Sequence, residues 1–186
     1  MVNPAPKGSM NFWVNLFKAP TEKEDLETVL KSMPPFEKLK SKYIDQIIEL
    51  IHNRVYGVNE HLFLQGDPGI GLFIIREGEV LIKHTDEFGV SHNLAVFKRG
   101  DFFGEMALLE DDTRSASAIA TKETSAAVIF KPDLDEFIDR NPAQGTKVLR
   151  GISKILALRL RLVNQEYFDL YQKVFQQNRE KLSDGD

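Results

Sequence analysis

The sequence contains no cysteine. This absence excludes a disulfide-stabilised scaffold and a metal site built from thiolates, and it suits a reducing compartment. Long apolar runs are also missing, since none approaches the roughly 20 residues that a membrane-spanning helix needs. The N-terminus lacks the charged, apolar and small-residue order of a secretory signal. We therefore expect a cytoplasmic protein.

There is no strong excess of charge of either sign. The 186 residues carry a formal net charge of -4, so the basic footprint of a nucleic-acid-binding domain is absent. The length predicts one domain with a good core. We expect four segments in order: a leader with a short aromatic helix (1–20), N-terminal helices (21–52), a β-roll (53–142) and a long C-terminal helix (143–186). Residues 1–9 could be an added leader before a native Met10.

The stretch from Phe102 to Ser117 contains several residues that suit ligand binding. Gly104 carries no Cβ, so the backbone there can come close to another group. Met106 then starts a short helix whose first amide groups have no intrahelical partner and form an anion site. Glu105 supplies an acceptor, and Arg114 returns from a loop as a cation. This set suits a phosphate-sized anion with an adjacent hydroxyl.

Structural roles are the alternative for the same residues. Arg114 at a strand edge could pair with Glu110 or Asp111, which on a surface contributes little. Glu105 could stabilise the helix dipole without any ligand. Three adjacent carboxylates ending at Asp112 point in different directions on a loop, which favours a solvated turn over a metal site.

The stretch resembles the phosphate-binding cassette of the cyclic-nucleotide-binding domain family. The family pattern appears here as Phe103-Gly104-Glu105-Met106-Ala107 and Arg114-Ser115-Ala116. The resemblance extends over approximately residues 36 to 162. It implies that the ligand-binding residues are Phe103, Gly104, Glu105, Met106, Ala107, Arg114, Ser115 and Ala116. It also implies that Arg114 binds the cyclic phosphate and that Glu105 accepts the ribose 2′-hydroxyl.

The resemblance says less about the base of the nucleotide. Ser115 stands where the family varies with base preference, and serine there is similar to the bacterial catabolite activator branch, which binds cAMP. We therefore expect cAMP rather than cGMP. A lid over the base is expected from the long helix, with Arg159, Leu160 and Asn164 as candidates.

Two amphipathic helices are predicted ahead of the β-roll. Thr21 with Glu24 forms a capping box for the first helix. Ser41 can cap the second helix, whose buried stripe is formed by the isoleucines Ile44, Ile47, Ile48 and Ile51.

An aromatic stripe precedes these helices. It consists of Phe12, Trp13, Leu16 and Phe17, which share one helical face. Such a short helix either packs onto the domain or serves as a docking or membrane-surface segment.

Short strands are predicted for most of the central region. Turn signals recur about every ten residues after Gly57, and 126–130 forms a final apolar strand. This pattern indicates a mainly β fold with flanking helices, an antiparallel β-roll of the jelly-roll type.

The C-terminal region predicts one long helix from about Gln144 to Arg179. Its apolar residues Leu156, Leu160, Val163, Tyr167, Leu170 and Val174 alternate at spacings of four and three, which is the seam of a coiled coil. We expect a homodimer through this seam. The alternative is a seam that covers the β-roll.

These features predict a non-catalytic cyclic nucleotide sensor that acts on a partner protein or on dimer geometry. No nucleophile with an adjacent base is evident, so an enzyme is not expected. A transcription factor is not expected either, since nothing after the long helix could form a helix-turn-helix. Two alternatives remain open: a ligand-free interaction scaffold of the same fold, and a cupin-type metalloenzyme. The latter requires clustered histidines, which His52, His61, His84 and His92 do not show.

Overall fold

The computed structural model describes residues 26–109 and 112–183, with side chains to residue 176. Two short helices, α1 (Leu26–Ser32) and α2 (Ser41–Glu49), come first. The predicted capping box of Thr21 and Glu24 and the aromatic stripe of residues 12–17 lie outside the described residues.

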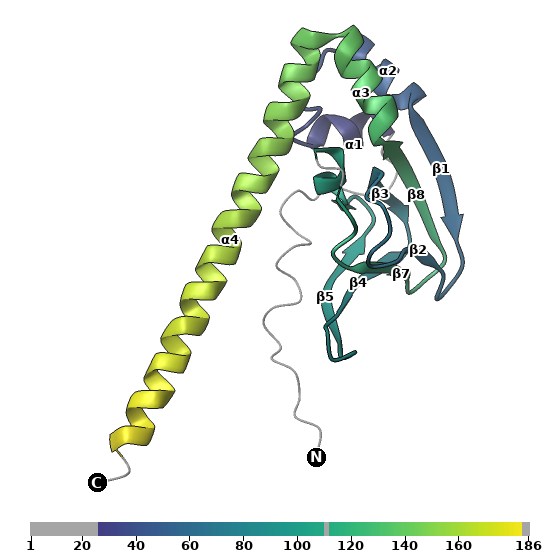
Figure 1. Ribbon diagram of the computed structural model, residues 1–186. Helices are drawn as coiled ribbons and strands as arrows, with labels where there is room; N and C mark the ends of the chain where they lie inside the picture. Colours follow the sequence, from purple (N-terminus) through teal and green to yellow (C-terminus); the bar gives the residue numbers. More distant parts are fainter. Residues whose placement is uncertain (1–25, 110–111, 184–186) are drawn as a thin grey trace.

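The strands form two antiparallel sheets that pack face to face (Figure 1). They are β1 (Ile51–Tyr56), β2 (His61–Phe63), β3 (Gly71–Glu77), β4 (Glu79–Thr85), β5 (Ser91–Lys98), β6 (Phe102–Phe103), β7 (Ser117–Ala120) and β8 (Thr124–Phe130). One sheet has the order β1-β8-β3-β6, and the other has the order β2-β7-β4-β5. The predicted β-roll with flanking helices is thereby confirmed.

Strand β3 lies at the centre of the packing because it is buried on both faces. Successive side chains of a strand point to opposite faces. Leu72 and Ile74 therefore pack against the helices, while Phe73 and Ile75 fill the space between the sheets. This two-sided burial explains why the strand reads as a continuous apolar run.

Helix α2 differs from the prediction at both ends. Lys40 is its N-cap residue, with no side-chain cap bond, and the hydroxyl of Ser41 instead accepts a hydrogen bond from Lys31 at 3.1 Å. The helix ends at Glu49, so placing Ile51 on the helical stripe was wrong. Ile51 begins β1 because it pairs with Ile129 of β8, a contact far away in the sequence.

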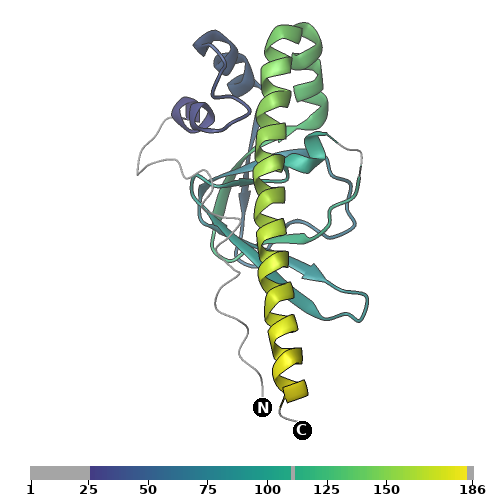
Figure 2. The ribbon, with the colours of Figure 1, turned by 90° about the vertical axis from the view of Figure 1, so that its left-hand side faces the viewer.

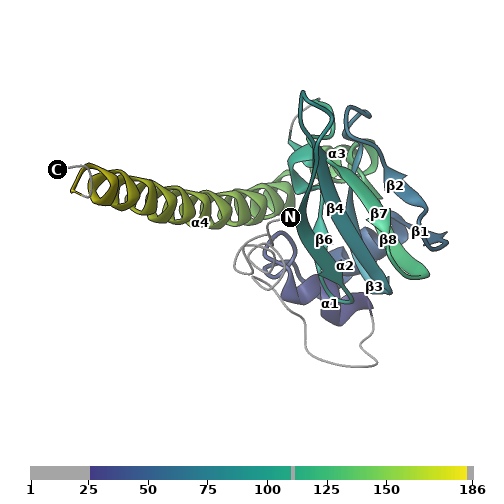
Figure 3. The ribbon, with the colours of Figure 1, turned by 90° about the horizontal axis from the view of Figure 1, so that it is seen from below.

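Helix α3 (Lys131–Arg140) leads into α4 (Pro142–Ser183), which starts two residues earlier than predicted. The first half of α4 packs beside α1, as Figures 1 and 2 show. Gly151 lies at this contact, where a Cβ would collide with the carbonyl oxygen of Pro34. The second half of α4 projects away from both sheets (Figure 3). Within the described part of the chain, no helix combines the length and the apolar character needed to cross a membrane.

Candidate functional site

In the turn before η1 (Glu105–Leu108), Gly104 lies close to the backbone of Gly71 and to the side chain of Arg114. Gly104 has a φ of +83°, in the left-handed region that glycine adopts without strain. A Cβ there would lie 2.8 Å from the carbonyl oxygen of Gly71 and 2.9 Å from Nη1 of Arg114. Only glycine fits this close approach. The predicted helix is a single 3-10 turn of four residues, so its dipole is small and the arginine is the stronger source of positive charge.

Arg114 is held rigidly in the interior, with 7% of its surface exposed. Its Nη2 donates a hydrogen bond to the carbonyl oxygen of Gly71 at 2.9 Å. Its guanidinium carbon lies 4.2 Å from the ring centroid of Phe63 and 5.6 Å from that of Phe73. Arg114 is therefore not a surface residue, and the two acidic partners of the structural alternative, Glu110 and Asp111, lie outside the described residues.

Arg114 carries its positive charge in a largely desolvated setting. Burial lowers the pKa of its guanidinium from the usual value, while the negative charges of Glu105 and Asp67 act in the opposite direction. The group stays a cation, because guanidinium is not deprotonated in proteins. Its Nε is buried and has no hydrogen-bond partner among the described residues.

Glu105 connects the cassette to the long helix. Its side chain is 2% exposed, and its Oε1 is paired with Nη1 of Arg159 on α4, whose side chain is 16% exposed. Its Oε2 is buried and has no partner in the part of the chain that the structure describes. One carboxylate oxygen therefore holds α4, and the other can accept a hydrogen bond.

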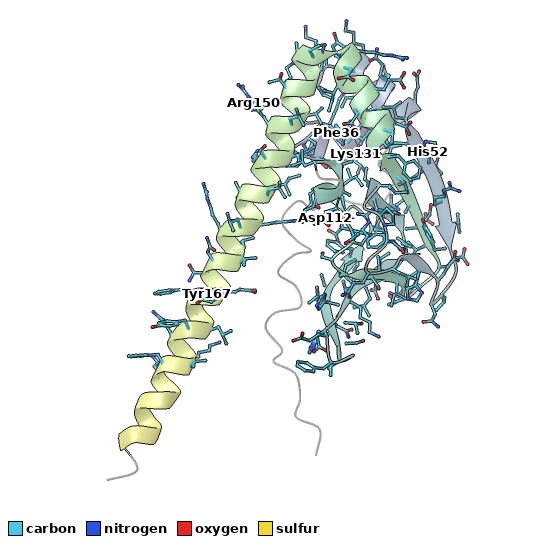
Figure 4. The ribbon with its side chains drawn as sticks, viewed as in Figure 1. Phe36, His52, Asp112, Lys131, Arg150 and Tyr167 are labelled. Atoms are coloured by element: carbon cyan, nitrogen blue, oxygen red, sulfur yellow. The ribbon has the colours of Figure 1, made fainter. Side chains whose placement is uncertain are left out.

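These side chains border a cavity of about 280 Å³. Its lining comprises Phe63, Gly69, Ile82, Leu94, Ala95, Phe97, Phe103, Gly104, Glu105, Met106, Ala107, Asp112, Thr113, Arg114, Ser115, Ala116 and Arg159. Asp112 lies on the side of the β-roll that faces α4 (Figure 4). The volume lies just below the roughly 300–1,000 Å³ that ligand pockets span.

All eight cassette residues named from the sequence line this cavity. Of the three lid candidates, Arg159 lines it. Leu160 and Asn164 are exposed on α4 and are not part of the lining. Sequence reasoning missed the apolar wall of Ile82, Leu94, Ala95 and Phe97, which comes from β4 and β5. Only tertiary packing brings those strands to the cassette.

Two further missed residues have local signals that were too weak. Gly69 was only one of the recurring turn signals, whereas a Cβ there would lie 2.7 Å from the carbonyl oxygen of Asp112. His84 was considered only as one of four histidines that form no cluster. Its Nδ1 lies 2.8 Å from the carbonyl oxygen of Ser115, so it donates a hydrogen bond that fixes the backbone beside Arg114.

A metal centre finds no support in the described residues. Among them, no group of three or more histidine, cysteine, aspartate or glutamate side chains is placed to hold an ion. His52 bonds Asp133 and His92 bonds Asp86, at separate places in the fold.

The fold and the site together define a class, a β-roll with a pocket lined by a buried arginine and a buried glutamate. Residues 53–141 match the cyclic nucleotide-binding domain family. The chain is 33% identical over 137 residues to the cyclic AMP receptor protein of Thermus thermophilus, covering 74% of this chain and 62% of that protein. It is 34% identical over 104 residues to the cAMP-dependent protein kinase regulatory subunit of Neurospora crassa, covering 55% and 24% respectively.

Solved structures agree with this class. The crystal structure of the Thermus thermophilus catabolite activator protein matches with a TM-score of 0.66 and 33% identity, over 74% of this chain and 63% of that one. The chain thus contains a cyclic nucleotide-binding domain, as its cassette residues predicted. It spans less than two thirds of the length of each of these relatives.

Proposed function

We propose that the chain is a non-catalytic sensor that binds a 3′,5′-cyclic nucleotide, and cAMP in preference to cGMP. One observation carries the proposal. The buried Arg114 guanidinium and the buried Glu105 carboxylate line the same cavity, and each has one polar atom without a partner among the described residues. Buried polar groups are nearly always hydrogen-bonded, so a ligand with an acceptor and a donor would complete the site.

Arg114 is the group that binds the cyclic phosphate. Its guanidinium is already fixed by the Gly71 carbonyl and by the Phe63 ring, so little conformational entropy is lost when an anion arrives. A charge-assisted hydrogen bond in this buried setting is stronger than one in water. A phosphate oxygen would accept from the donor that the protein leaves unused.

Glu105 is the group that binds the ribose. Its Oε2 accepts the 2′-hydroxyl while its Oε1 keeps the ion pair with Arg159. The nucleotide and α4 therefore share one carboxylate, and binding at the pocket acts on the position of the helix. A ligand shifts such an equilibrium only through different affinities for the two helix positions.

The base lies against the apolar wall formed by β4 and β5. Adenine is favoured because Ser115 matches the cAMP-binding branch and because the relatives named above are cAMP receptors or cAMP-dependent regulators by their names. The remaining lid candidates, Leu160 and Asn164, close over the base only if α4 moves toward the roll.

The output of the sensor is a change in dimer geometry or in contact with a partner protein. Five of the six seam residues, from Leu160 to Val174, are exposed. They therefore do not cover the β-roll, and the seam is available for a second copy of the chain. Leu156, the first seam residue, packs against the core instead.

Calorimetric titration with cAMP and cGMP tests the proposal. We expect the wild type to bind both and to bind cAMP more tightly. Arg114→Ala should lose about 2–5 kcal/mol of binding free energy, which is roughly a 30-fold weakening or more. Arg76→Ala is the matched control, because Arg76 is an exposed arginine on β3 that is outside the pocket lining.

Two results would contradict the proposal. If the Arg114→Ala variant and the wild type bind the nucleotide with equal affinity, Arg114 does not contact the ligand. A wild type that shows neither heat of binding nor a melting shift with either nucleotide would favour a ligand-free scaffold of the same fold.

A further inference from the structure

A second cavity, of about 350 Å³, shares part of its wall with the cassette cavity. Arg114 and Phe63 line both cavities. The other residues of the second lining come from β1, β2, β3 and β8 and from the turn at 67–70, and none of them belongs to the described part of α4. Strands β1 and β8 lie on the side of the roll away from the second half of α4 (Figures 1 and 3). The volume falls within the roughly 300–1,000 Å³ that ligand pockets span.

Strand β1 supplies polar groups to this cavity because of its pairing with β8. Directly opposite residues of an antiparallel pair have their side chains on the same face of the sheet. Arg54 is opposite Ala126, and Tyr56 is opposite Thr124. Ala126 belongs to the apolar cluster between the sheets, and Tyr56 packs against that cluster. The register therefore places a guanidinium and a phenol on the inner face of an edge strand.

The apolar part of the lining is rich in aromatic rings. Phe63 and Phe73 have ring centroids 5.4 Å apart, and Phe130 packs against the same cluster. Aromatic rings pack well against one another in offset-stacked or edge-to-face arrangements. A flat aromatic body therefore suits this cavity better than a strongly polar one.

The charged groups of the lining favour an anion. Two guanidinium groups, those of Arg54 and Arg114, stand against the single carboxylate of Asp67. Oδ2 of Asp67 already accepts a hydrogen bond from the backbone N–H of Leu64 at 2.7 Å. Arg54 forms no hydrogen bond or ion pair within the described part of the chain. Burial raises the pKa of the Tyr56 hydroxyl, so this group remains a hydrogen-bond donor at neutral pH.

We propose that the second cavity binds a small aromatic carboxylate. The planar fork of Arg54 matches the geometry of a carboxylate group, and the aromatic ring of the ligand packs against Phe63 and Phe73. The site is separate from the cassette cavity, because Arg54 and Phe73 are absent from the cassette lining. It does not depend on the proposed binding of a cyclic nucleotide.

Calorimetric titration with 2-naphthoate tests the site, and 2-naphthamide is the uncharged analogue. We expect 2-naphthoate to bind the wild type at one site and 2-naphthamide to bind about 10-fold more weakly. Arg54→Gln should weaken 2-naphthoate binding about 10-fold, because it removes a hydrogen bond between charged groups. The matched control is Arg99→Gln, an exposed arginine that lines neither cavity, and it should bind like the wild type.

Both variants replace exposed residues, so the fold is retained, and circular dichroism verifies this. Three results would overturn the proposal. The first is a wild type that does not bind 2-naphthoate. The second is an Arg54→Gln variant that binds as tightly as the wild type or no more weakly than Arg99→Gln, which would place the carboxylate elsewhere. The third is equal affinity for 2-naphthoate and 2-naphthamide, which would mean that the cavity does not select an anion.

Discussion

The two halves of α4 have similar apolar residues and opposite surroundings. In the first half, Val148, Ile152 and Ile155 are fully buried against the same domain. In the second half, Leu170 and Tyr167 are 61% and 70% exposed. Both halves show helical periodicity of apolar residues. Periodicity therefore does not distinguish an apolar stripe that is buried within the chain from one that is exposed.

The difference follows from the length of the helix. At 42 residues, α4 is about 63 Å long, about twice the diameter of a small domain. Its second half therefore extends beyond the β-roll. Arg159 lies near the middle of the helix and, among the described residues of α4, is the one that lines the pocket. In the proposed mechanism, a ligand that binds Glu105 changes the position of α4. The contact lies where α4 ceases to pack against the rest of the domain.

The largest expected effect comes from a matched pair of truncations in the two halves. Ile152→Ala should lower the free energy of unfolding by about 2–5 kcal/mol, because it opens a cavity in a fully buried contact. Val163→Ala should change it by less than about 0.5 kcal/mol, because that side chain is exposed. Denaturant unfolding at low protein concentration measures both. Equal losses would mean that the second half is also buried within one chain.

A smaller effect is expected at the junction of the halves. Arg159→Ala leaves the buried Glu105 carboxylate without its partner from α4, which should destabilise the fold by about 1–3 kcal/mol. Water can enter beside the partly exposed Arg159 side chain, which keeps the loss below that of a fully buried pair. Thermal unfolding compares this variant with Arg161→Ala, the exposed neighbour. If the two variants melt alike, the ion pair does not hold the helix.

The smallest effect on folding is expected from the seam. Leu160→Ser combined with Leu170→Ser should cost the monomer under about 1 kcal/mol, mostly through lower helix propensity. The same change should abolish dimer formation in sedimentation, because it places polar groups in the proposed contact. A dimer that survives both substitutions would show that association uses another surface.

Local motifs made it predictable that the residues around Gly104 lie together at one cavity. The turn glycine Gly104, the acceptor Glu105 and the cation Arg114 lie close together in sequence. Their spacing can therefore be recognised as a motif. The β-roll was predictable because strand alternation and turn residues are also local. Some assignments depend on tertiary pairing, which the local sequence does not reveal. Ile51 continued a helical stripe by periodicity, yet its pairing with Ile129 makes it a strand residue.

The part of α4 that lines the cavity was hard to predict for a related reason. Which residue of a long helix faces the pocket depends on how the helix lies against the roll. In this protein, the close contact of Gly151 with Pro34 helps to fix that position. A glycine inside a helix signals close packing but does not name its partner. Arg159 therefore lines the cavity, while its neighbour Leu160 and the next-turn Asn164 do not.

The central claim is that the pocket holds a cyclic nucleotide through Arg114 and Glu105. A calorimetric titration of cAMP and 2′-deoxy-cAMP into the wild type and Glu105→Gln tests it most directly. The wild type should bind cAMP at least about 10-fold more tightly than the deoxy analogue, since a hydrogen bond to a buried charge is worth about 1.5–3 kcal/mol. In the variant this preference should fall to about fivefold, because a neutral hydrogen bond is worth about 1 kcal/mol. A wild type that does not bind cAMP, or a variant that keeps the full preference, would contradict the account.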